Sequence, residues 1–264
     1  MGSATREALA GSRAALAELG RADLAVAEGL LAAGRVIGSS SQLRTALTDA
    51  EADATQKRAL VERVFGAQLP AAAVSLVVTA ASSRWSSGGD FLAGIEELGY
   101  RIAADSAAEG VDIDAELFAF DRAVATDSEL ELALGSKLSA VDVKSKLVDR
   151  LLGGKASPQT VAIVQNLVQQ PRGRRIGEAL RHAATVVADQ RGFDIATVTS
   201  AAPLSTEQLA RLEQGLQAQS GRPIRFDTIV DPALLGGVRV QIGDDVIDGS
   251  VASRLSSLRQ KLAG

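Results

Sequence analysis

The side chains that most often carry chemistry are scarce in this chain. Its 264 residues include no cysteine and a single histidine, His182. Without cysteine, thiol nucleophiles, thiolate zinc sites, iron–sulfur clusters and disulfides are excluded. A Ser-His-Asp triad would have to pass through His182, and a metal site would need carboxylates alone or carboxylates around that imidazole. The sequence therefore favours a protein that is not an enzyme and needs no cofactor or metal.

Three carboxylates near the C-terminus, Asp244, Asp245 and Asp248, are the best candidate for a cation site. Their spacing lacks the ligand loop that a calcium site needs, which favours an exposed hairpin turn. An enzyme that uses these carboxylates stays as an alternative, and tight binding of a divalent metal would support it.

Arginines gather at the start of a helical pattern, at Arg172, Arg174, Arg175 and Arg181. Positive charge there opposes the helix dipole. A solvated face is the default interpretation, while an acidic partner segment or membrane headgroups would explain the placement better. The neighbouring His182 is interpreted as a helix-surface or satisfied interior residue.

Charge and hydropathy narrow the class of partner. The 28 basic and 32 acidic residues give a net charge of -4, which disfavours nucleic acid as the main partner. The longest apolar stretch, residues 24–37, is interrupted by Glu28 and Arg35 and is too short to span a bilayer. The N-terminus lacks a signal-peptide pattern, so we expect a soluble, unprocessed protein on the cytoplasmic side.

Alanine and leucine recur at helical spacing from Ser3 to about Arg191. Expected helices cover residues 3–19, 21–37, 41–48, 54–65, 70–85 and 90–107. At the end of the fifth of these, Trp85 is predicted to be a half-buried aromatic rather than a partner contact.

The helical pattern is repeated. Residues 57–66 (KRALVERVFG) return as residues 144–153 (KSKLVDRLLG), a shift of 87 positions (144 − 57 = 87). Residues 30–37 and 41–47 return at the same shift, and Val74 matches Val161. Matching charge order as well as apolar spacing indicates an internal duplication. We expect the register to slip after Val161, and we expect the second copy to lack the first helix, with residues 90–124 bridging the copies as one or two helices.

The pattern changes at Gly192. Residues 193–199 are β-branched and predict a strand, and Ser205 with Gln208 predicts a capping box at a helix start. Residues 223–230 and 238–242 alternate like strands, and a turn at residues 243–245 predicts a hairpin through Val246 and Ile247. A last amphipathic helix is expected from Ser250.

One stretch carries a specific resemblance. Residues 230–250 (VDPALLGGVRVQIGDDVIDGS), followed by Arg254, Leu255 and Leu258, closely resemble the C-terminal signature of the delta subunit of bacterial F-type ATP synthase, a relative of the mitochondrial oligomycin-sensitivity-conferring protein. The duplicated helical part resembles the long actinobacterial form of that family. The fold implied is mainly α: a duplicated six-helix-type bundle, residues 1–110 and 111–192, followed by a small α/β domain, residues 193–264.

The resemblance implies a non-catalytic stator subunit of the peripheral stalk. Its helical part would receive the N-terminal helices of alpha subunits, and its C-terminal part would hold the b or b′ chains, so that the catalytic head resists rotor torque during proton-driven ATP synthesis. The protein would then be a peripheral membrane protein through its complex. Which helical copy binds the alpha subunits stays open. An unrelated helical scaffold or adaptor with a small α/β tail is the alternative.

Seven residues are candidates for partner binding. The first helix carries a leucine stripe that is expected to line a groove for an alpha-subunit helix, although such a stripe could equally face its own bundle. The C-terminal candidates are a glycine pair before a strand and two leucines on the last helix. The full set is Leu9, Leu16, Leu19, Gly236, Gly237, Leu255 and Leu258.

Overall fold

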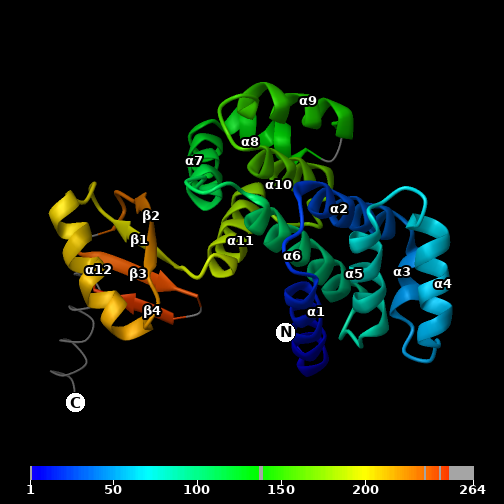
Figure 1. Ribbon diagram of the computed structural model, residues 1–264. Coiled ribbons are helices and arrows are strands. Elements are labelled where there is room, and N and C mark those ends of the chain that lie inside the picture. The colour runs from blue at the N-terminus through cyan, green and yellow to red at the C-terminus, as the bar shows by residue number, and fades with distance from the viewer. Residues whose placement is uncertain (1, 137–138, 235, 244, 250–264) are drawn as a thin grey trace, which may run out of the picture. The chain divides into compact units, whose positions relative to one another are not determined.

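The computed structural model describes residues 2–136, 139–234, 236–243 and 245–249 (Figure 1). The chain divides into two compact units, Met1–Val187 and Ala188–Gly264. The first unit is helical and the second contains a four-stranded sheet.

The first six helices follow the sequence expectation closely. They are α1 Ser3–Leu19, α2 Leu24–Ser39, α3 Ser41–Thr48, α4 Ala54–Phe65, α5 Ala71–Ser82 and α6 Gly88–Ser106. Side-chain caps mark three of the starts, since Asp23, Ser40 and Ser87 accept hydrogen bonds from backbone N–H groups of α2, α3 and α6. The cap at Ser87 starts α6 two residues earlier than expected.

The next five helices repeat this order. They are α7 Ile113–Thr126, α8 Ser128–Gly135, α9 Val141–Leu152, α10 Pro158–Gln169 and α11 Ile176–Gln190. The bounds of α8, α9 and α10 lie 87 positions after those of α3, α4 and α5 at both ends. The predicted slip after Val161 is therefore wrong, because α10 keeps the register to its last residue.

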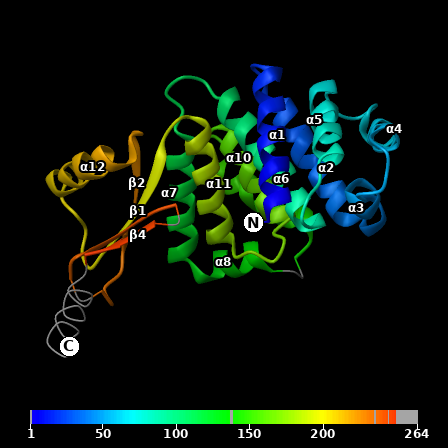
Figure 2. The same cartoon turned by 90° about the horizontal axis from the view of Figure 1, so that it is seen from below.

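The second copy does have a counterpart of the first helix, contrary to expectation. A shift of 87 places α1 on residues 90–106, and α6 covers Gly88–Ser106. Helix α6 is thus both the last helix of the first bundle, α1–α6, and the first helix of the second bundle, α6–α11. It packs against α1, α2 and α5 of the first bundle and against α10 of the second, and it lies in the middle of the helical unit (Figures 1 and 2).

Equivalent positions in the two bundles are buried alike. Leu47 and Leu134 are both buried, as are Val61 and Val148. Even the lysine is shared, because Lys57 in α4 and Lys144 in α9 are 6% and 5% exposed. Lys57 Nζ donates to Ala81 O at 3.0 Å, which satisfies one of its buried donors. That residues 1–110 and 111–192 form two separate domains stays a prediction.

The second unit is a mixed sheet in the order β2-β1-β3-β4 with one helix among its described residues. The elements are β1 Asp194–Ser200, α12 Thr206–Ser220, β2 Ile224–Val230, β3 Val238–Ile242 and β4 Asp245–Asp248. Strand β1 pairs parallel with β2 and antiparallel with β3, and β3 and β4 form the predicted hairpin.

The capping box of α12 is confirmed, because Ser205 and Gln208 bond each other's backbone N–H groups. Leu216 of this helix closes a small core with Ala196, Val198, Ile224 and Val240 from the strands. The last expected helix, from Ser250, lies outside the described residues.

Candidate partner-binding surfaces

The leucine stripe of α1 mostly faces its own bundle. Leu9 and Leu16 are buried, and only Leu19, at the end of the helix, is exposed, by 38%. The helix packs against α5 and α6. Two polar contacts fix it there: Thr5 Oγ1 donates to Asp90 Oδ2 at 3.0 Å, and Arg13 Nε donates to Glu97 Oε1 at 2.8 Å.

The opposite face of α1 is open and lined by small residues. Ala10, Gly11, Ala14 and Ala17 are all exposed. In α6, the equivalent positions 87 residues later are Glu97, Leu98, Arg101 and Ala104, and all four are buried. The two first helices of the two bundles therefore differ: α1 has a free face, whereas the same face of α6 is covered.

A carboxylate in the middle of α6, missed by the sequence analysis, organises the contact between the bundles. Glu96 Oε1 accepts from Tyr100 Oη at 2.8 Å and from Arg174 Nη2 at 2.7 Å. Its other oxygen lies 3.0 Å from Arg172 Nη2. Burial, followed by the charge of Glu96, raises the pKa of Tyr100 well above its usual value, so the phenol stays protonated and donates.

Three of the four arginines are held in ion pairs, and Arg172 and Arg174 are half-buried, which corrects the default prediction of a solvated face. Arg172 and Arg174 bind Glu96, and Arg181 Nη1 lies 2.8 Å from Asp121 Oδ2. Of the four, only Arg175 has an exposed side chain and no ion pair among the described residues. Burial works against the charge on Arg174, but the hydrogen bond and the charge of Glu96 outweigh it and raise the pKa.

His182 lies on α11 near this network and makes no hydrogen bond with any other residue that the structure describes. Its side chain is exposed at the surface. Partial desolvation, and then the positive charge of Arg174, lower the pKa of His182 below its usual 6.5. The imidazole is therefore neutral at pH 7, in agreement with the interpretation as a helix-surface residue.

Trp85 is buried rather than half-buried. It lies after the end of α5, where its Nε1 donates to Ala80 O at 2.7 Å and its ring meets Phe91 edge-on at 5.9 Å. It is 9% exposed, so it offers little surface to a partner. The helix predicted over residues 70–85 ends at Ser82, because the backbone becomes extended at Ser83.

The α/β unit presents a different kind of surface. Val230, Val246 and Ile247 are 45–48% exposed, at the ends of the sheet and on its edge strand β4. Gly236 and Gly237 have positive φ of 86° and 81°, which explains the glycine pair as a sharp turn before β3. Leu255 and Leu258 lie outside the described residues.

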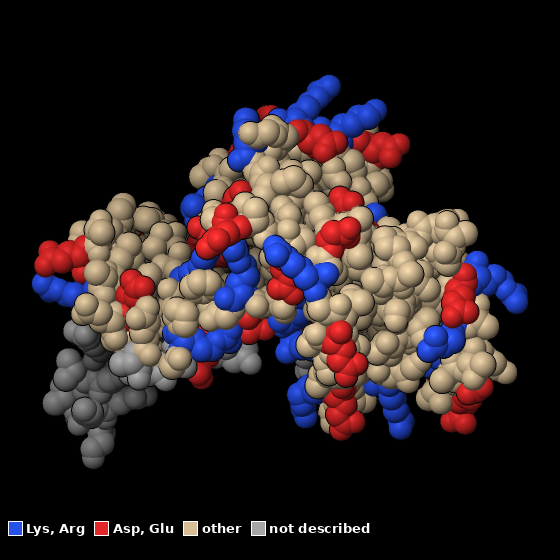
Figure 3. Space-filling model, in the orientation of Figure 1, with Lys and Arg blue, Asp and Glu red and all other residues tan. Residues whose placement is uncertain are grey.

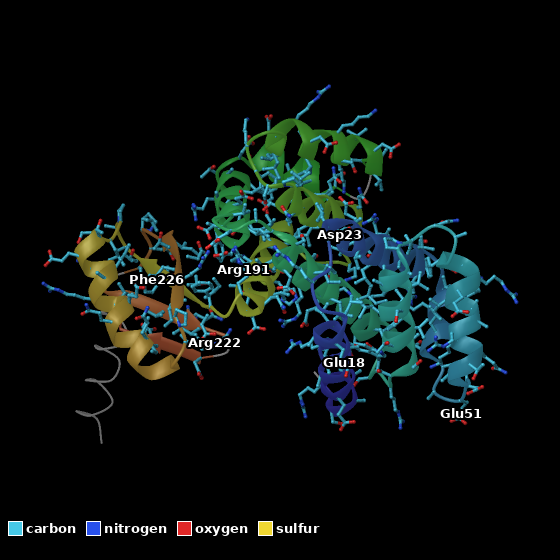
Figure 4. All side chains as sticks on the ribbon, in the orientation of Figure 1. Glu18, Asp23, Glu51, Arg191, Arg222 and Phe226 are labelled. Atoms are coloured by element: carbon cyan, nitrogen blue, oxygen red, sulfur yellow. The ribbon has the colours of Figure 1, made fainter. Side chains whose placement is uncertain are left out.

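Two aspartates hold the start of this unit in place. Arg222, labelled in Figure 4, lies 3.0 Å from Asp189 at the end of α11 and 3.1 Å from Asp194 at the start of β1. The candidate partner residues of α1 lie in the first unit, and those around Gly236 lie in the second.

No metal or membrane site emerges from the described ranges. No group of three histidine, cysteine, aspartate or glutamate side chains in them could hold a metal ion. Asp245 and Asp248 are exposed on β4, and Asp244 is not described. None of the described helices is long and apolar enough to cross a bilayer. Acidic and basic side chains are interspersed on the face drawn in Figure 3.

Comparison with known proteins decides the family. The model of the family described as ATP synthase delta (OSCP) subunit matches residues 100–262. The ATP synthase subunit delta of Leifsonia xyli subsp. xyli is 58% identical over 265 residues, which cover all of both chains. The chain belongs to this family. It is therefore a delta-type, non-catalytic subunit of ATP synthase and a component of the peripheral stalk, as the C-terminal signature predicted.

Other members are similar along nearly the whole chain. The Streptomyces griseus delta subunit is 38% identical over all of both chains, and that of Kineococcus radiotolerans is 40% identical over 90% of this chain and 87% of its own. A chain of the Toxoplasma gondii mitochondrial ATP synthase hexamer is 21% identical, with a TM-score of 0.44 over 64% of this chain and 96% of its own. The family match begins inside α6, so the first bundle lies largely outside it.

Proposed function

We propose that this delta-family subunit joins the catalytic head to the stalk by holding alpha-subunit N-terminal helices on its helical unit and the b or b′ chains on its α/β unit. The subunit would act on the cytoplasmic face of the membrane, to which it is attached only through the complex. Membership of the family carries the proposal. The division into two compact units supports it, because an adaptor needs two separate surfaces.

For the head, we place the binding surface on the first bundle. A partner helix can approach closely where the exposed residues are small, as at Ala10, Ala14 and Ala17 on α1. The equivalent face of α6 is buried by the first bundle. Duplication has therefore covered that face in the second bundle and left it open in the first. The buried Leu9 and Leu16 would support this surface from below, and Leu19 would lie at its end.

A point substitution tests the head surface better than deletion of α1, because deletion would expose the core behind Leu9 and Leu16. Ala14→Glu puts a long charged side chain in the middle of the small-residue face. The matched control is Ala123→Glu, an exposed alanine on α7 in the second bundle. We expect Ala14→Glu to weaken binding of the full chain to the catalytic head at least ~10-fold in a sedimentation assay, and Ala123→Glu to change it little. Equal loss in both variants would contradict the assignment.

For the stalk, the exposed apolar residues Val230, Val246 and Ile247 favour burial over charge as the source of affinity. The test is titration of a peptide from the C-terminal end of a b chain onto the full chain at low and at high salt. Binding that survives high salt and is weakened by Ile247→Asp supports the proposal. Binding that is lost in salt would assign the contact to charged residues instead.

A further inference from the structure

A pocket of about 480 Å³ opens on the helical unit at the N-terminal end of α6. Three arginines from three different elements line it: Arg35 of α2, Arg44 of α3 and Arg172 of the loop between α10 and α11. The stem of Arg44 lies against Gly88, where a Cβ would be 3.1 Å from its Cδ. No aspartate or glutamate is among the described residues that line the pocket.

The positive charge of this pocket is only partly balanced. Arg35 Nη1 donates to Asn166 Oδ1 at 2.9 Å, and Arg44 Nη1 donates to Gly38 O at 3.2 Å. Both acceptors are neutral, and neither arginine has an ion pair among the residues that the structure describes. Each guanidinium therefore keeps further N–H donors for an anion.

Arg172 shares its single carboxylate with another arginine. Its Nη2 lies 3.0 Å from Glu96 Oε2, while Arg174 takes the other oxygen of the same group. Arg172 Nη1 donates to Gly89 O at 3.2 Å, and its Nε is buried without a hydrogen-bond partner. The residue also has a positive φ of 50°, which is costly for a side chain of this size.

Burial raises the free-energy cost of the charges on Arg35 and Arg172. Desolvation is the main reason that the pKa of Arg35 and the pKa of Arg172 are lowered from their usual values. An anion placed among the three guanidinium groups would offset that cost, since attraction is strong where water is partly excluded.

The second bundle does not repeat this arrangement. At the shift of 87, Arg35 corresponds to Arg122 and Arg44 corresponds to Glu131. The same two positions therefore carry opposite charges in the second bundle and like charges in the first. At these two positions, only the first bundle has two positive charges.

The remaining walls indicate what kind of anion fits. Leu92 and Pro171 add apolar surface, and the side chain of Gln170 lies between α2 and the loop, where its Nε2 donates to Gly34 O at 3.1 Å. A free inorganic anion would use the guanidinium groups but not the apolar walls. A pocket of this size accommodates a side chain together with part of its backbone.

We propose that the pocket of Arg35, Arg44 and Arg172 binds an acidic peptide segment, with a glutamate or aspartate carboxylate held by the arginines and a neighbouring apolar side chain on Leu92 and Pro171. The inference rests on the proposed adaptor function in one respect, that the segment belongs to another subunit of the complex. The site itself can be tested without that complex.

The probe is a synthetic peptide of alanine, leucine and glutamate, titrated onto the full chain by calorimetry and compared with the same peptide carrying glutamine in place of glutamate. Two variants change the site: Arg44→Glu, which reproduces the residue of the second bundle, and Arg44→Gln, which removes the charge alone. Arg63→Glu is the matched control, an exposed arginine on α4 outside the pocket. Thermal unfolding checks that each variant is folded.

We expect the glutamate peptide to bind at least ~10-fold more tightly than the glutamine peptide, and Arg44→Glu to abolish that preference. Arg44→Gln should weaken the preference for the glutamate peptide by less, and Arg63→Glu should leave this preference within ~2-fold of the wild-type value. Equal binding of the two peptides, or an unchanged preference in Arg44→Glu, would overturn the proposal. Inorganic phosphate that binds more tightly than the peptide would also overturn it, in favour of a free-anion site. If the peptide binds in the pocket but the full chain does not bind the catalytic head, the proposed function is contradicted and the proposed site is not.

Discussion

Arg181 of α11 forms an ion pair with Asp121 of α7, with 2.8 Å between Nη1 and Oδ2. The equivalent residues of the first bundle are both glycines, Gly94 in α6 and Gly34 in α2. There α2 packs against α6, and a Cβ on Gly34 would be 3.4 Å from Ile95 of α6, whereas a Cβ on Gly94 would collide with the ring of Trp85, between α5 and α6. The same two positions are therefore occupied by closely packed glycines in the first bundle and by an ion pair in the second.

The Asp121–Arg181 pair should contribute little to stability at neutral pH. Burial raises the pKa of Asp121 above its usual 3.8, although Arg181 opposes that shift. Because the folded-state pKa is the higher one, the folded protein binds the proton more tightly, and stability from this group declines as pH rises from 3.8 through the raised value. Asp121→Asn should therefore change the free energy of unfolding by no more than about 1 kcal/mol at pH 7.

Urea unfolding at pH 7 and pH 4 measures this, with the exposed Asp142→Asn as the control. As the pH falls, the free energy of unfolding of the wild type should increase relative to that of the Asp121→Asn variant. A loss of several kcal/mol in that variant at pH 7 would show that the pair is a main support of the second bundle.

Gly94 should tolerate no side chain. Gly94→Ala would force a methyl group into the buried Trp85 ring, and such overpacking costs about 1–3 kcal/mol despite the better helix propensity of alanine. The methyl group of Gly11→Ala on α1 would meet no atom within 4 Å, so this substitution should raise the free energy of unfolding by up to about 1 kcal/mol. Urea unfolding followed by the fluorescence of the single tryptophan compares them. Similar effects of the two substitutions would contradict the packing described here.

Glu96 should be the most sensitive charged residue of the helical unit. Glu96→Ala leaves Arg172 and Arg174 without their shared carboxylate, and loss of one partner from a buried ion pair costs about 3–5 kcal/mol. The exposed Glu62→Ala, which breaks an i,i+4 pair with Arg58, should cost no more than about 0.5 kcal/mol. Denaturant unfolding of both variants gives the comparison, and equal costs would refute the role assigned to Glu96.

The single histidine permits a direct titration. The pKa of His182, followed by the NMR shift of its ring protons, should lie below 6.5, and Arg174→Gln should raise it. The groups that act on it are Arg174, Arg172, Glu96 and Glu97. Since the unfolded chain binds this proton more tightly, the histidine lowers stability as pH falls through 6.5, by a small amount because its ring is exposed. A pKa at or above 6.5 would contradict this environment.

Local patterns predicted local structure well. The helices over residues 41–48 and 54–65, the capping box at Ser205 and the β3–β4 hairpin are confirmed, because each depends on side-chain periodicity or on turn and cap residues within a few positions. The family was accessible for the same reason, since its signature is one continuous stretch of residues.

Long-range relationships were not accessible in the same way. Glu96 and Arg174 are 78 positions apart, and neither α6 nor the loop before α11 shows by its own pattern that it contacts the other. The sequence signal was present in part, because two adjacent glutamates interrupt an otherwise apolar face of α6. The double role of α6 was missed because shared burial, not residue identity, relates it to α1: Leu9 and Leu16 become Glu96 and Ala103.

A helix that closes one bundle and opens the next has a consequence for how such a protein can lengthen. Each copy adds its own helices onto the last helix of the copy before, so growth needs no linker and no new kind of junction. A subunit built in this way can be extended by whole repeats, as a solenoid can. Each junction buries the faces of the helix that two copies share. Among the first helices of the copies, only that of the first copy keeps an exposed face.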